Sequence, residues 1–171
     1  MESKAKLLGH PAHTILIVFP LGLLAASTLF DVTYLFTDNR VFALVAYWTT
    51  VGGLLGGLVA AIPGFIDWRA IDAGTRAKRV GAVHGLGNVV VLTLYGFSWF
   101  LRRHETDNLP SVLALCGSFA GFALAGVTGW LGSELVDRLG VGVYTHANLN
   151  APSSLSGRAA ADTVPVRGSV N

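Results

Sequence analysis

Four long apolar stretches, separated by short polar segments, dominate the sequence. They cover about residues 13–36, 41–66, 80–101 and 110–135. Each is close to the roughly 20 residues that a helix needs to cross a hydrocarbon core about 30 Å thick. None alternates apolar and polar residues as a barrel strand does, and open strands would leave unpaired backbone groups in lipid. The pattern therefore predicts four transmembrane helices.

The polar segments between these stretches are short, at residues 37–40, 67–79 and 102–109. Short connections make consecutive helices antiparallel neighbours. We therefore expect an all-α, polytopic membrane protein whose residues 13–143 form an antiparallel four-helix bundle. Residues 1–12 precede it as an N-terminal segment. Residues 144–171 are rich in Ser, Ala, Pro, Asn and Gly, a composition that buries little apolar area and predicts a disordered tail.

Composition supports a lipid environment and narrows the possible chemistry. Hydrophobic residues make up 52% of the chain and charged residues 13%, against about 25% charged in a typical soluble domain. The lipid bilayer is therefore the expected partner. The net charge of +2 is too small to indicate a nucleic-acid partner. Cys116 is the single cysteine, which excludes an internal disulfide and a cysteine-rich metal site. Metal chemistry would have to use His and carboxylates.

The distribution of Lys and Arg predicts the orientation. Only Arg40, Arg102 and Arg103 fall on the side opposite the termini, and the other nine basic residues lie on the side of both termini and the middle loop. The positive-inside rule then places both termini in the cytoplasm. Lys4 and Lys6, followed by an apolar run and small residues at 25–27, also resemble a secretory signal. The apolar run continues beyond those small residues, which favours a membrane helix.

This topology brings ionisable residues from all four helices to one layer in the cytoplasmic half. The layer contains His13, Asp67, His84 and Glu134, and His10 lies just outside it. Asn88 lies four residues after His84 on the same helical face. Ionisable groups at membrane depth are costly and are functional candidates by default. Asp67 and Glu134 could also simply pair with nearby arginines. Asp31, in the other half, is expected to be an interfacial or helix-packing acid.

Small residues predict close helix packing. Glycines recur in the second, third and fourth stretches, and Gly53, Ala60 and Asp67 recur at seven-residue spacing in the second. Such a face could receive a neighbouring helix or a flat ligand, because small residues let backbones approach each other.

Several motifs together resemble the bacterial membrane family called domain of unknown function 2231. They are Gly-His-Pro-Ala-His at 9–13, Phe-Pro-Leu-Gly at 19–22, Gly-Phe-Ile-Asp at 64–67, the pair of His84 and Asn88, Gly-Trp-Leu-Gly-Ser-Glu-Leu-Val at 129–136, and Gly-Val-Gly-Val at 140–143. The similarity covers about residues 7–143. It implies a four-helix protein of the bacterial inner membrane without an assigned activity. Some relatives carry cytochrome c or Rieske domains, which implies redox membrane proteins as partners.

We consider three functions. The first is a haem b or divalent metal site in the cytoplasmic half, associated with redox proteins. His13 and His84 would be axial ligands with His10 as an alternative and Asn88 beside them, while an ion would use His13, His84, Asp67 and Glu134. The second is transport of protons or small solutes through Asp67, His84, Asn88 and Glu134. The third is a structural or assembly subunit, including a homo-oligomer. No motif favours an enzyme acting on a soluble substrate.

Overall fold

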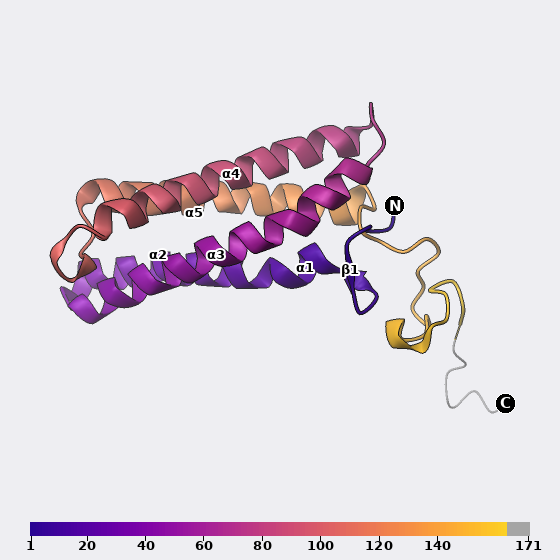
Figure 1. Ribbon diagram of the computed structural model, residues 1–171, viewed down its shortest axis with the longest axis horizontal. Coiled ribbons are helices and arrows are strands. Elements are labelled where there is room, and N and C mark those ends of the chain that lie inside the picture. The colour runs from indigo at the N-terminus through magenta and orange to yellow at the C-terminus, as the bar shows by residue number, and fades with distance from the viewer. Residues whose placement is uncertain (164–171) are drawn as a thin grey trace.

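The computed structural model describes residues 1–163, and expectations for residues 164–171 lie outside this range. Four long helical segments lie side by side in it (Figure 1). In chain order the elements are β1 (Lys6–Leu7), β2 (His10–Pro11), α1 (Ala12–Leu16), α2 (Val18–Thr37), α3 (Arg40–Ala70), α4 (Arg76–Arg102), η1 (Thr106–Asn108), α5 (Val112–Ser133), the π-helical turn η2 (Glu134–Arg138) and η3 (Ser154–Ser156). The predicted all-α bundle is therefore confirmed.

Four helical segments are long and apolar enough to cross a membrane: Ala12–Thr37, Arg40–Ala70, Arg76–Arg102 and Thr106–Arg138. At most 28% of the most apolar window of each is buried inside the protein, so most of their apolar side chains face outward. A surface of this kind is stable in lipid. Polar side chains cap three helix starts: those of Asn39, Thr75 and Ser111 accept backbone N–H bonds. The helices α3 and α4 extend beyond the predicted apolar stretches, whereas α5 begins two residues inside its stretch.

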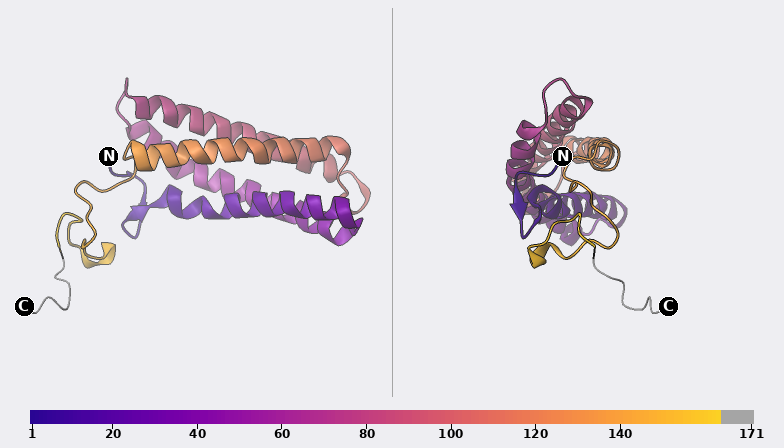
Figure 2. Two further views of the ribbon diagram at one scale, coloured as in Figure 1. Left: turned by 180° about the vertical axis from the view of Figure 1, so that it is seen from behind. Right: turned by 90° about the vertical axis from the view of Figure 1, so that its right-hand side faces the viewer.

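The two ends of the bundle differ. The N-terminus, the connection at 71–75 and the segment after η2 gather at one end, which we call the terminal end (Figures 1 and 2). The α2–α3 turn and the α4–α5 connection lie at the other end, which we call the far end. At the terminal end Tyr144 donates a hydrogen bond to the Gly9 carbonyl, and Ser154 Oγ donates one to the Leu8 carbonyl over 3.1 Å. Disorder of the tail stays a prediction.

The bundle consists of two equivalent helical hairpins. Hairpin 1 comprises α1, α2 and α3, and hairpin 2 comprises α4 and α5. Helices α1 and α2 of hairpin 1 correspond to α4 of hairpin 2, and equivalent residues differ by 71 in number. This offset aligns His13 with His84 and Ser27 with Ser98. Helix α3 corresponds to α5, and equivalent residues differ by 68 in number. This offset aligns four identical pairs: Ala46 and Ala114, Gly53 and Gly121, Val59 and Val127, and Gly64 and Gly132.

Equivalent positions make equivalent contacts. A Cβ on Gly53 would lie 2.5 Å from a Leu24 side-chain atom, and one on Gly121 would lie 2.9 Å from the Tyr95 ring. Leu24 and Tyr95 are themselves equivalent, and both belong to the small buried core with Val91. Equivalent residues of the two hairpins also meet each other, His13 with His84 and Asp31 with Arg102. Such contacts indicate an approximate two-fold axis along the helices, as in membrane proteins built from parallel repeats. The sequence left open whether the glycine face of α3 contacts a neighbouring helix or a flat ligand. In the structure, side chains of α2 and α4 pack on it at Gly53 and Gly57.

Candidate functional site

Two histidines from equivalent positions meet between the hairpins. His13 begins hairpin 1 in α1, and His84 lies two turns into α4. Their ring centroids are 6.3 Å apart and the ring planes are nearly perpendicular. Both side chains are half-buried. The structure thus brings together the two imidazoles that the sequence predicted at one depth.

The protonation pattern of both rings follows from their hydrogen bonds. His13 Nδ1 lies 2.8 Å from the Ala60 carbonyl oxygen, and His84 Nδ1 lies 2.9 Å from the Thr128 carbonyl oxygen. A carbonyl oxygen only accepts, so Nδ1 carries the proton in each ring. In the neutral form each Nε2 therefore carries a lone pair, which in His84 faces Asn88 Nδ2; a neutral imidazole is the form that binds a metal. Ala60 and Thr128 are equivalent residues of α3 and α5.

A glycine lies under each imidazole. A Cβ on Gly64 would lie 2.8 Å from His13 Nδ1, and a Cβ on Gly132 would lie 3.2 Å from His84 Cε1. Both glycines lie one turn after the residue whose carbonyl holds the ring. Because glycine has no side chain, the imidazole can approach the neighbouring helix closely enough to bond its backbone.

Asn88 lies next to His84, as the sequence predicted. Its Nδ2 is 3.2 Å from His84 Nε2 and 3.0 Å from the His84 carbonyl, while its Oδ1 accepts from Thr128 Oγ1 over 3.0 Å. Thr128 is thus bonded to His84 through its carbonyl and to Asn88 through its hydroxyl. These bonds fix one face of α4 against α5.

The other predicted site residues have different partners. Asp67 accepts from Ser3 Oγ over 2.7 Å and from the backbone N–H of Lys4 over 2.6 Å. Glu134, in η2, pairs with Arg76 at 2.7 Å. His10 Nε2 lies 3.1 Å from Ser154 Oγ at the exposed hairpin between β1 and β2. Within residues 1–163 no three His, Cys, Asp or Glu side chains form a group that could hold a metal ion.

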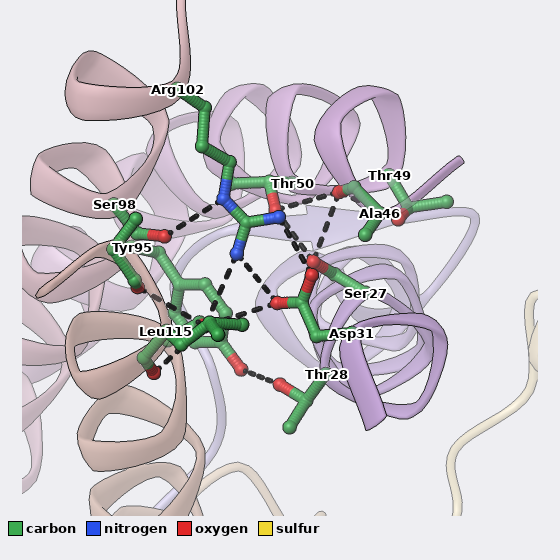
Figure 3. Close-up of polar contacts among 12 residues, drawn as sticks. Ser27, Thr28, Asp31, Ala46, Thr49, Thr50, Tyr95, Ser98, Arg102 and Leu115 are labelled. Atoms are coloured by element: carbon green, nitrogen blue, oxygen red, sulfur yellow. Dashed lines mark hydrogen bonds and ion pairs between the residues drawn. The ribbon is translucent and has the colours of Figure 1, made fainter. Parts of the chain in front are cut away.

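A second polar cluster occupies the far half of the bundle (Figure 3). Arg102 donates from Nη1 and Nη2 to the two carboxylate oxygens of Asp31, over 2.7 and 2.6 Å. Both side chains are 0% exposed. Ser98 Oγ accepts from Arg102 Nε over 3.2 Å, and Ser118 Oγ donates to Asp31 over 3.1 Å. Each charged group thus also bonds a serine hydroxyl, which helps to offset the cost of burying the ion pair.

Further hydroxyl groups surround this pair. Ser27 Oγ and Thr50 Oγ1 lie 2.6 Å apart and hydrogen-bond to each other, and both lie within hydrogen-bond distance of the Ala46 carbonyl oxygen, at 3.0 and 2.8 Å. Tyr95 Oη lies 2.7 Å from Thr28 Oγ1 (Figure 3). The sequence predicted Arg102 to lie in the polar connection 102–109 at the far end. In the structure it is the last residue of α4 and its side chain is buried. Asp31 is a packing acid, as one of the two expectations had it. The 71-residue offset between them is the signal in the sequence that points to their contact.

The family model described as a predicted membrane protein (DUF2231) matches residues 9–145. This range contains His13, His84, Asp31 and Arg102 and all four membrane-spanning segments. No curated protein and no solved structure matches the chain.

Proposed function

The chain belongs to the DUF2231 family of predicted membrane proteins, and from this premise we propose that it binds a haem b between its two hairpins through His13 and His84. Bound haem supplies a one-electron redox centre. The protein would then be a redox-associated component of the bacterial inner membrane. The Lys and Arg distribution supports an orientation with both termini in the cytoplasm.

The single observation that carries this proposal is the matched hydrogen bonding of the two imidazoles. Both donate Nδ1–H to a backbone carbonyl of the second helix of their own hairpin. Such a bond to the non-ligating nitrogen orients a metal-binding histidine and fixes its tautomer. Metal to imidazole bonds are about 2 Å long, so two imidazoles on one metal have ring centres roughly 6 Å apart. The observed 6.3 Å fits this separation.

The donor set favours haem over a bare divalent ion. An ion held by side chains would need Asp67 or Glu134 to join the imidazoles, but these carboxylates are bonded to the N-terminal segment and to Arg76. Haem iron would need only the two imidazole nitrogens as its protein ligands. His84 Nε2 now accepts a hydrogen bond from Asn88 Nδ2 over 3.2 Å, and this bond would be replaced if His84 became an axial ligand. His10 is held by Ser154 and is the less suitable axial donor.

The test is an absorption spectrum of the protein purified in detergent, oxidised and then reduced with dithionite, with elemental analysis of the same sample. We expect sharp α and Soret bands that disappear in His13→Ala and in His84→Ala. His104→Ala and His146→Ala are matched controls, because both residues are exposed and lie away from the pair. The controls should keep the bands.

Other outcomes would overturn the proposal. Stoichiometric metal without a Soret band would indicate an ion site, and bands that survive both His13→Ala and His84→Ala would place haem elsewhere. A flat spectrum without metal would leave transport or an assembly role.

A further inference from the structure

We propose that Asp31 and Arg102 determine which hairpins pair. The two hairpins share their packing design, so a hairpin could also pair with its own kind from a second copy of the chain. Their charges prevent this. Two copies of hairpin 1 would bring Asp31 against Asp31, and two copies of hairpin 2 would bring Arg102 against Arg102. Only hairpin 1 with hairpin 2 brings opposite charges together. This inference holds whether or not the imidazoles bind a cofactor.

The position of the pair on the approximate two-fold axis makes the selection strong. Residues at equivalent positions meet at this axis, as the contact of His13 with His84 shows. A histidine pair is compatible with any combination of hairpins, whereas a pair of like charges is not. Asp31 and Arg102 are 0% exposed, so water cannot screen a mismatch. Lipid gives no hydrophobic drive for pairing, which leaves polar contacts and close packing to decide partners.

The surroundings of the pair would accept the charges in exchanged positions. Arg102 is bonded to Ser98 one turn before it, and Ser27 holds the equivalent place before residue 31. Asp31 accepts from Ser118, and Thr50 is the equivalent hydroxyl in hairpin 1. An arginine at 31 would thus find Ser27, and an aspartate at 102 would find Thr50.

The first experiment compares charge reversals in the full-length chain by size-exclusion chromatography in detergent. Asp31→Arg and Arg102→Asp alone should lose about tenfold or more of the monodisperse monomer, because each buries like charges. The double variant D31R/R102D should restore it. Asp38→Arg with Arg103→Asp is the control, since both residues are exposed at the far end. Single reversals that remain monomeric, or a double reversal no better than the single ones, would overturn the proposal.

The second experiment tests partner choice directly. The Asp31→Arg and Arg102→Asp chains are produced together with two different affinity tags. If hairpins exchange between these chains, each hairpin 1 meets a hairpin 2 of opposite charge, so the two chains should co-purify. Two differently tagged copies of Asp31→Arg carry an arginine in both hairpins, so exchange cannot bring opposite charges together, and these copies should not co-purify. Recovery of the mixed pair in no greater amount than the like pair would contradict charge-directed pairing.

Discussion

Asp31 and Arg102 hold the same place in two successive hairpins and meet as a bidentate ion pair with no exposure to solvent. At the other end of the same axis, His13 and His84 also hold equivalent places but are identical. The bundle is thus symmetric where imidazoles meet and asymmetric where charges meet.

Removing one partner of the ion pair should be costly. In Arg102→Met the Asp31 carboxylate stays buried without its counter-charge, so we expect the free energy of unfolding to fall by about 3–5 kcal/mol. Adding Asp31→Leu should recover most of this loss, because an apolar pair leaves no buried charge. Thermal unfolding in detergent measures both. A double variant as unstable as Arg102→Met would show that the ion pair stabilises the bundle beyond cancelling its own burial.

A methyl group at Gly64 should disturb His13. Its Cβ would lie 2.8 Å from His13 Nδ1 and would force the ring away from the Ala60 carbonyl. Gly85→Ala is the matched control, since no atom lies within 4 Å of its added Cβ. Both changes gain helix propensity, but Gly64→Ala also loses a hydrogen bond worth about 1 kcal/mol. We expect it to be less stable than the control by about that amount in thermal unfolding. Equal stability would contradict the packing of His13 on Gly64.

The N-terminal segment should be released when Asp67 is removed. Ser3, Lys4 and Ala5 all donate to this carboxylate. Hydrogen bonds to charged groups are worth about 1.5–3 kcal/mol each, so loss of three should open the segment roughly a thousandfold more often. Trypsin cleavage at Lys4 and Lys6 in Asp67→Ala measures this. Asp72→Ala, at an exposed residue of the α3–α4 connection, should cleave at the original rate.

The ion pair of Lys6 with Glu2 should give the N-terminal segment a pH dependence. The hydrogen bond from Lys6 lowers the pKa of Glu2 below its usual 4.5, and the same bond raises the pKa of Lys6 above 10.5. The contribution of Glu2 is complete above pH 4.5 and is lost as pH falls through the lowered value. The contribution of Lys6 is complete below pH 10.5 and is lost above it. The contact is therefore intact between these limits.

An NMR titration of the Glu2 carboxyl carbon measures this pH dependence. In Lys6→Met the midpoint should rise toward 4.5, because the donor is gone. An unchanged midpoint would show that Lys6 is not the cause of the lowered pKa.

The sequence was sufficient for the fold because the bilayer constrains it so strongly. Four apolar stretches without alternation leave helices as the only arrangement, and short connections leave antiparallel neighbours. The shared depth of His13 and His84 followed from the same topology. Their contact with each other and with Ala60 and Thr128 did not, because rotation of each helix about its axis depends on packing that hydropathy does not encode.

Depth in the membrane does not say which partners a carboxylate has. Asp67 and Glu134 lie near the terminal end as expected, but local partners take their oxygens. Arg102 follows an apolar stretch and looks like a flanking charge, yet its long side chain reaches back along α4 into the bundle. The direction of side chains toward the helix N-terminus explains this, and it is not visible in a hydropathy pattern.

The offset between Asp31 and Arg102 also sets an order of events during synthesis. Asp31 leaves the ribosome 71 residues before its partner. At about 5–20 residues per second the interval is roughly 4–14 s. During that time hairpin 1 carries an unpaired acid that is costly in lipid. The acid becomes paired only when α4 has been inserted and brings Arg102 to it, so the first hairpin reaches its final state only after the second half of the chain is made.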